Sequence, residues 1–124
     1  MAAATTPQKT VMVVEDEPAI RSLLCLTLEC ENYHVEAASD GQEALSKVAQ
    51  VLPDAIVLDL MLPIMDGWTL IDALSEGSQT ESIPIIAVSA MQRYHDVGER
   101  GVQAFLSKPF DVDTLLVVLA DVLQ

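Results

Sequence analysis

The feature that most constrains the fold of this chain is the regular alternation of short apolar runs with segments of helical periodicity. Five runs rich in apolar residues are separated by segments in which apolar side chains recur every three or four residues. All runs except the second lack the alternation of polar and apolar residues that is typical of a half-exposed sheet, which indicates strands buried on both faces. We therefore predict an α/β fold, with a parallel sheet covered by helices on both faces. The runs are Thr10–Val14, His34–Ala38, Ala55–Leu58, Ile85–Val88 and Val102–Leu106.

Start signals support the helices expected between these runs. Pro18 suits the first turn of a helix, and Asp40, Asp66 and Asp111 precede three further segments, where a carboxylate can cap a helix. A weaker helical pattern covers residues 92–100, so five helices are expected in all. The first helix is expected to bury a stripe formed by Ile20, Leu23, Leu24 and Thr27.

Length and charge limit the organisation and the partners of the chain. Its 124 residues, of which 51% are hydrophobic, suit one domain at 9–124 preceded by a flexible tail at 1–8. Six basic residues against 19 acidic residues give a formal charge of −13, which disfavours direct binding to nucleic acid or to a membrane. Two cysteines placed within one helix are poorly placed to form a disulfide with each other, and this indicates a reducing, cytoplasmic environment.

Polar residues follow four of the five runs. Glu15 and Asp16 come after the first run, Asp59 after the third, Ser89 after the fourth, and Lys108 slightly beyond the fifth. Because the carboxyl ends of parallel strands meet at one edge of a sheet, these side chains should lie together. Crowded carboxylates repel each other, and a hard divalent cation with oxygen ligands relieves that repulsion. The pattern predicts a Mg²⁺ site.

Each of these features has an ordinary explanation when it is taken alone. Acidic residues after a strand often form a solvated loop or a helix cap, and Lys-Pro is common in turns. Their combination at one edge lacks a structural purpose, whereas phosphoryl transfer requires a carboxylate nucleophile, a metal, a hydroxyl and a cation. The site is therefore predicted to transfer a phosphoryl group to a carboxylate.

With these motifs the sequence resembles the receiver domain of two-component response regulators over about residues 9–124. The resemblance implies a flavodoxin-like, doubly wound sheet of five strands in the order 2-1-3-4-5, with five helices. The matching segments are VVEDEP at 13–18, SDGQEAL at 39–45, DAIVLDLMLPIMDGW at 54–68, IPIIAVSA at 83–90 and FLSKPF at 105–110.

The resemblance also implies roles for the acidic residues. Asp59 would be the phosphoacceptor and a metal ligand. Glu15 and Asp16 would hold Mg²⁺ with it, and the backbone carbonyl of Met61 would be a further ligand. Ser89 would bind a phosphoryl oxygen.

Further residues complete the site that the resemblance implies. Lys108 would pair with a phosphoryl oxygen, and the peptide bond before Pro109 would be cis. Ala90 is small and would leave access for the donor.

Phe105 would turn inward on phosphorylation as part of a switch, although it could equally be an ordinary core residue. Met61 and Met91 stand where the family tunes the lifetime of the phosphoryl group, and neither side chain can orient a water, so slow self-dephosphorylation is expected.

The function implied is a phosphorylation-dependent signalling switch rather than an enzyme. The donor would be a histidine kinase or a histidine phosphotransfer protein, and the surface of the last two strand–helix units would change. The stretch from Ser89 to Lys108 is about one turn shorter than is usual in the family. Together with Val117, which falls well off the core stripe, and Val118 on its flank, this indicates a partner or homodimer surface, unless these valines are ordinary surface residues. The downstream effector is not indicated.

Three other functions are conceivable for a site of this kind. An FMN-binding electron carrier is disfavoured, because acidic residues after the first run would repel the phosphate. A phosphatase with an aspartyl nucleophile would have a second aspartate where Met61 stands. A receiver-like adaptor that binds partners without phosphorylation is the remaining alternative, and the intact acidic site disfavours it.

Overall fold

The computed structural model describes residues 8–62, 64–90 and 102–124. The predicted tail therefore lies outside the described residues except for Gln8, as does the helix predicted at 92–100. Within the described residues, strands and helices alternate as the sequence predicts. In chain order they are β1 (Thr10–Val14), α1 (Pro18–Cys30), β2 (His34–Ala38), α2 (Gly41–Val51), β3 (Ala55–Asp59), α3 (Gly67–Ser75), β4 (Ile85–Ser89), β5 (Val102–Ser107) and α4 (Val112–Val122).

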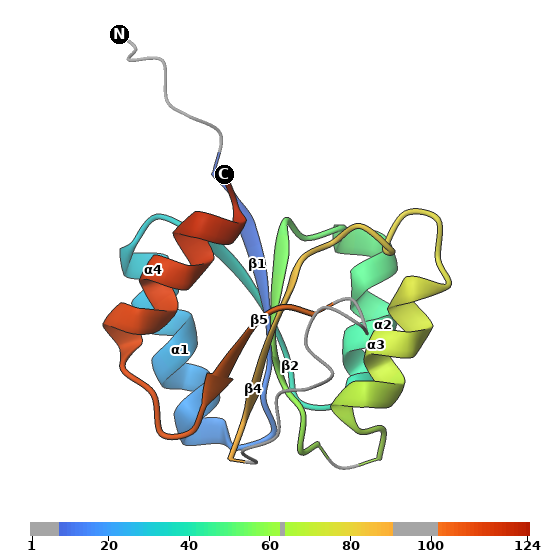
Figure 1. The fold of residues 1–124 in the computed structure, drawn as a ribbon, viewed down its shortest axis with the longest axis horizontal. Helices are drawn as coiled ribbons and strands as arrows, with labels where there is room; N and C mark the ends of the chain where they lie inside the picture. Colours follow the sequence, from blue (N-terminus) through green and yellow to red (C-terminus); the bar gives the residue numbers. More distant parts are fainter. Residues whose placement is uncertain (1–7, 63, 91–101) are drawn as a thin grey trace, which may run out of the picture.

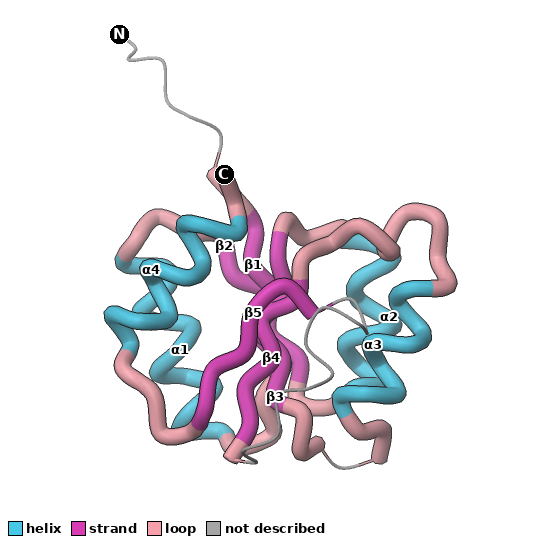
Figure 2. Tube along the Cα trace, viewed as in Figure 1, coloured by secondary structure: helices cyan, strands magenta, loops and turns pink. Residues whose placement is uncertain are grey.

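The five strands form one parallel sheet in the order β2-β1-β3-β4-β5. Helices α1 and α4 cover one face of this sheet, and α2 and α3 cover the other (Figures 1 and 2). The predicted fold class and strand order are confirmed. Among the described residues four helices are present, and none of them is long and apolar enough to span a bilayer.

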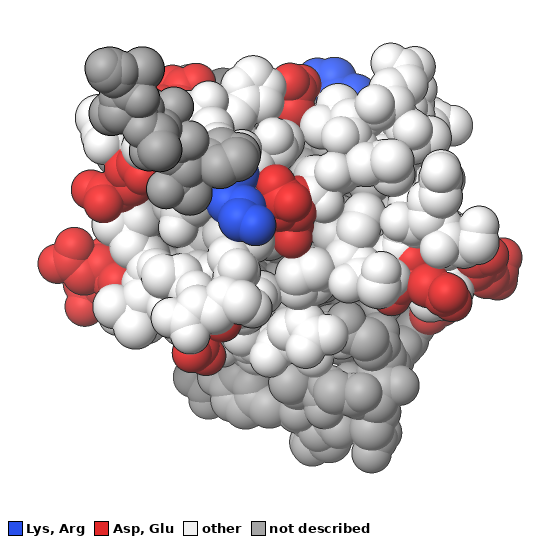
Figure 3. All heavy atoms as spheres, turned by 90° about the horizontal axis from the view of Figure 1, so that it is seen from above, with Lys and Arg blue, Asp and Glu red and all other residues white. Residues whose placement is uncertain are grey.

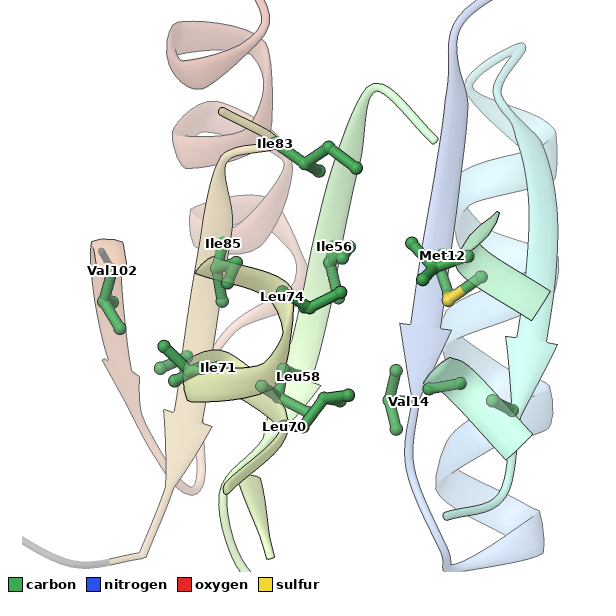
Figure 4. Packing of buried hydrophobic residues seen from close by; sticks show 14 of the residues in the cluster. Met12, Val14, Ile56, Leu58, Leu70, Ile71, Leu74, Ile83, Ile85 and Val102 are labelled. Carbon is green, nitrogen blue, oxygen red and sulfur yellow. The ribbon is translucent and has the colours of Figure 1, made fainter. Parts of the chain in front are cut away.

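The hydrophobic core lies in two layers, one on each face of the sheet. Val11 and Val13 point towards α1 and α4, whereas Met12 and Val14 point towards α2 and α3. Successive side chains of a strand alternate between faces, and both sets are fully buried because each face is covered by helices. Figure 4 shows the second layer, in which apolar side chains of α3 pack against the strands. Figure 3, which views the molecule from above relative to Figure 1, shows several acidic side chains and few basic ones on the described part of this face.

The buried stripe of α1 differs from the predicted one. Leu24 and Leu28 are buried, with Ile20 partly buried against the same layer, and Leu23 is 55% exposed. Residues at i, i+4 and i+8 share a face, and these three residues form that row. The prediction was wrong for Leu23 because the sheet receives only a narrow stripe of this helix.

The start of α3 lies close to the end of β3. Asp66 caps this helix, since the Thr69 amide donates to its carboxylate at 2.8 Å. The Gly67 amide donates to the Leu60 carbonyl at 3.0 Å. A Cβ atom on Gly67 would lie 2.6 Å from Leu60 Cα and 3.1 Å from the Asp59 carbonyl oxygen. This close approach requires glycine, and it fixes the strand end that carries Asp59.

Candidate functional site

The polar residues singled out by the sequence lie at the carboxyl ends of four neighbouring strands. Glu15 follows β1, Asp59 ends β3, Ser89 ends β4, and Lys108 follows β5. The strand order reverses between β1 and β3, because β1 leads to β2 on one side and β3 leads to β4 on the other. Ligands of open α/β sheets bind at such a point.

Three carboxylates form a compact cluster there. Glu15, Asp16 and Asp59 each offer an oxygen, and these oxygens lie within 4.8 Å of one another. Glu15 is 3% exposed and Asp59 is 4% exposed, whereas Asp16 is open to solvent. Burial raises the pKa of Glu15, and the nearby negative charge of Asp59 raises it further. A set of oxygen donors with one open side fits a partly hydrated Mg²⁺.

Lys108 supplies the positive charge of the site. Its Nζ donates to Asp59 Oδ2 at 2.9 Å and to Glu15 Oε1 at 3.3 Å. Burial by itself lowers the pKa of Lys108, but its contacts with these two carboxylates outweigh burial, and the pKa is raised. The ammonium is therefore charged and bridges the two buried acids, while its side chain remains 26% exposed to solvent.

The loop between β1 and α1 is held by hydrogen bonds to its own backbone. The Glu17 amide donates to Glu15 Oε2 at 3.1 Å. Arg21 Nη1 donates to the carbonyl oxygens of Glu15 at 2.9 Å and of Asp16 at 3.4 Å. Arg21 was not among the site residues predicted from the sequence. Its signal was its place one helical turn after the acidic triplet, where its side chain can reach back over the start of α1.

The remaining predicted site residues differ in their exposure. Ser89 is fully buried, Ala90 is exposed, and the Lys108 amide donates to the Ser89 carbonyl at 2.9 Å. The Met61 amide donates to Asp59 Oδ1 at 2.9 Å, which orients this carboxylate, and the Met61 side chain is 59% exposed.

Two further predicted residues lie on or next to β5. Phe105 is partly buried against the core layer on the α2 and α3 side. The peptide bond between Lys108 and Pro109 is cis. Met91 lies outside the described residues.

An apolar pocket of about 410 Å³ adjoins the acidic cluster. It lies between α1 and the connection from β5 to α4, and Ala90 and Lys108 belong both to its wall and to the site. The exposed Leu23 lies in the same wall. The cluster of carboxylates is therefore bordered by an apolar surface on the side of α1.

Comparison with known proteins places this geometry among related chains. The family model of the response regulator receiver domain matches residues 11–120. The DNA-binding dual master transcriptional regulator RpaA of Synechocystis sp. is 36% identical over 109 residues, which cover 86% of this chain and 45% of that protein. The chain thus spans less than half the length of this relative and of several others that it matches.

Solved structures show the same similarity. The chemotaxis response regulator CheY4 of Vibrio cholerae superposes with a TM-score of 0.88 at 32% identity, covering 94% of this chain and 99% of that one. The response regulator TrrA of Thermotoga maritima, solved in complex with Mg²⁺ and BeF, gives a TM-score of 0.82 at 28% identity, covering 93% and 99% of the two chains.

Proposed function

The chain belongs to the response regulator receiver domain family, and we propose that Asp59 is the residue that accepts its phosphoryl group. Receiver domains are phosphorylation-dependent signalling switches of two-component systems rather than classical enzymes, and this is the function of the chain. The observation that carries the assignment of Asp59 is its buried carboxylate, which lies in the acidic cluster and 2.9 Å from the Lys108 ammonium.

The chain binds Mg²⁺ at the acidic cluster, and we assign Glu15, Asp16, Asp59 and the Met61 carbonyl as the protein ligands. The bound ion offsets the negative charge of the incoming phosphoryl oxygens. Two features of the chain support this assignment: the clustered carboxylate oxygens, and the raised pKa of Glu15, which reflects a carboxylate buried beside another negative charge.

The reaction proposed for the chain transfers a phosphoryl group from a phosphohistidine. A carboxylate oxygen of Asp59 attacks phosphorus, the bond from phosphorus to the imidazole nitrogen breaks, and the imidazole leaves. Lys108 is placed to exchange its contact with Asp59 for one with a phosphoryl oxygen, since its Nζ already lies beside the nucleophile. Ser89 at the end of β4 would bind a second oxygen through its hydroxyl, and Ala90 leaves the approach open.

Three residues are proposed to set the response. Phe105 would move inward when Ser89 engages the phosphoryl group, and its partly buried position on β5 supports this role. Met61 and Met91 would give a long-lived phosphoryl group, because neither side chain orients an attacking water. Replacement of Met61 by Asn should therefore shorten the lifetime, measured as loss of phosphorylated protein after the donor is removed. An unchanged lifetime would contradict this role.

The proposed donor is a histidine kinase or a histidine phosphotransfer protein in the cytoplasm. The apolar pocket beside Lys108, with the exposed Leu23 in its wall, supports a protein donor that packs against this side while its histidine faces Asp59. On the output side, Val117 is 70% exposed on α4, and this supports a homodimer or a protein effector there. The charge of −13 supports an output that does not involve direct contact with nucleic acid or a membrane.

The experiment that tests the assignment is phosphorylation by acetyl phosphate with Mg²⁺, read by intact-protein mass spectrometry. The wild type should gain one phosphoryl group, and Asp59→Asn should gain none. Asp113→Asn is the matched control, because it removes an exposed carboxylate on α4. A wild type that takes up no phosphoryl group would instead favour the adaptor that binds partners without phosphorylation.

A further inference from the structure

The side chain of Arg21 donates hydrogen bonds to main-chain atoms of the acidic loop between β1 and α1. One guanidinium nitrogen donates to the carbonyl oxygens of Glu15 and Asp16, at 2.9 and 3.4 Å. The first distance is that of a good hydrogen bond, and the second is long and weaker. Both acceptors belong to residues whose carboxylates are part of the acidic cluster. The arginine therefore acts on the backbone of two proposed ligands.

These two hydrogen bonds restrain the backbone on both sides of the Asp16 Cα atom. A peptide unit is planar, so holding the Glu15 carbonyl sets the plane before the Asp16 Cα atom, and holding the Asp16 carbonyl sets the plane after it. With both planes set, the Cβ atom of Asp16 has one direction. Within the part of the chain that the structure describes, the Asp16 carboxylate makes no hydrogen bond or ion pair of its own.

The neighbouring ligand is held in a different way. The Glu15 carboxylate accepts from the Glu17 amide and from Lys108, and its side chain is buried. Asp59 likewise accepts from the Met61 amide and from Lys108. Asp16 is thus the exposed member of the cluster, and its position depends on the backbone that Arg21 holds.

We propose that Arg21 is a positioning residue for divalent-cation binding, which orients Asp16 toward Glu15 and Asp59 through the backbone of the β1–α1 loop. This inference rests on the proposed metal ligands. Groups that orient metal ligands typically contribute 10- to 100-fold to metal affinity. Because Asp16 is one ligand among several and one of the two hydrogen bonds is long, an effect at the lower end, roughly tenfold, is expected.

The direction in which Mg²⁺ affinity changes when Arg21 is replaced distinguishes a positioning role from an effect of its charge. A positive guanidinium beside a divalent cation repels it, so its removal would tighten Mg²⁺ binding if charge alone mattered. If Arg21 positions Asp16, its removal weakens binding. A residue that only stabilises the fold would change the unfolding temperature and leave the Mg²⁺ affinity as it was.

The test is isothermal titration of Mg²⁺ into wild type, Arg21→Met and Arg21→Lys, with far-UV circular dichroism to confirm folding. The dissociation constant should rise roughly tenfold in Arg21→Met, and by less in Arg21→Lys, which keeps the charge and can donate to one carbonyl. Lys9→Met, directly before β1, is the control for loss of one positive charge, and its affinity should equal that of the wild type. If Arg21→Met does not fold, a weakened Arg21→Lys decides in favour.

Phosphorylation by acetyl phosphate gives a second reading. In Arg21→Met the Mg²⁺ concentration for half-maximal rate should rise, and the rate at saturating Mg²⁺ should stay near that of the wild type. An Arg21→Met or Arg21→Lys affinity equal to or tighter than that of the wild type overturns the inference. Asp16→Asn tests the metal ligands separately from the role of Arg21. If this variant binds Mg²⁺ as well as the wild type, the proposed ligand set is wrong, and the proposed role of Arg21 is wrong with it.

Discussion

Replacement of Lys108 by Met tests the electrostatics of the site most directly. The ammonium of Lys108 lies 2.9 Å from Asp59 Oδ2 and 3.3 Å from Glu15 Oε1. Both carboxylates are nearly inaccessible to solvent. Methionine keeps much of the aliphatic chain and removes the charge, so the two acids would face each other without a counter-charge.

The size of the effect follows from these distances. At about 3 Å and an effective dielectric constant of about 20, each contact gives a gross attraction of roughly 5 kcal/mol. Desolvation of the three charged groups offsets most of this attraction, and breaking a buried ion pair typically costs about 3–5 kcal/mol. Because the Lys108 side chain is 26% exposed, solvent screens part of the interaction. We expect a loss of about 2 kcal/mol in the free energy of unfolding without Mg²⁺.

Mg²⁺ should reverse much of this loss. The cation and the ammonium are attracted to the same carboxylates and repel each other, so Lys108→Met should bind Mg²⁺ about tenfold more tightly, which corresponds to about 1.4 kcal/mol. Urea unfolding followed by circular dichroism, in EDTA and in saturating Mg²⁺, measures both effects.

Lys47→Met provides the control for this experiment. Lys47 pairs with Glu43 on α2 and also donates to the Ala37 carbonyl, and both charged side chains are partly exposed. Its loss should therefore cost about 1–2 kcal/mol and leave Mg²⁺ affinity unchanged. If Lys108→Met were as stable as the wild type in EDTA, or bound Mg²⁺ more weakly, the two acids would not depend on this ammonium and the reasoning would fail.

Four further substitutions test the fold. Gly67→Ala should cost about 1–3 kcal/mol in urea unfolding, because the added Cβ would lie 2.6 Å from the backbone at the end of β3, and an unchanged midpoint would contradict the close packing. Glu43→Gln should cost less than about 1 kcal/mol at pH 7, since hydrogen bonds from Ser39 lower the pKa of the half-exposed Glu43. A lowered folded pKa means that this stabilisation is present above the ordinary value of 4.5 and is lost as the pH falls through the folded pKa, so the difference between variant and wild type should shrink below pH 4.5. Leu28→Ala should cost about 3 kcal/mol and Leu26→Ala well under about 1 kcal/mol, because Leu28 is fully buried and Leu26 is 63% exposed; equal losses would refute the burial of α1.

The sheet and the location of the site could be predicted because both follow from local patterns. A run such as Ala55–Asp59 is apolar almost throughout, which occurs where helices cover both faces of a strand. Parallel strands then place their carboxyl ends at one edge, so the residues that follow them converge whatever the details of the helices. Glu15, Asp16 and Asp59 were predicted to cluster on this argument, and the structure brings them together.

Features that depend on three-dimensional packing could not be predicted in the same way. The stripe of α1 was assigned from spacing alone, and spacing allows both Leu23 and Leu24 to lie near the face of Ile20. Which leucine is buried depends on how the helix is rotated against the sheet, and this is set by contacts distant in sequence. Arg21 was missed for a related reason: its place one helical turn after the acidic triplet puts its side chain within reach of the loop, but the carbonyl groups that it contacts have no sequence signature.

The arrangement at the site also gives a physical reason for a switch. Two buried carboxylates side by side are unfavourable, as the raised pKa of Glu15 reflects, and Lys108 offsets this by bridging them. A phosphoryl group on Asp59 would offer Lys108 a more highly charged acceptor, and the contact with Glu15 would then compete with it. Lys108 follows β5 directly, and Phe105 lies on that strand. A change in the partner of one ammonium would thereby reach the edge strand of the sheet, and differential contacts of this kind are what shift a population between two states.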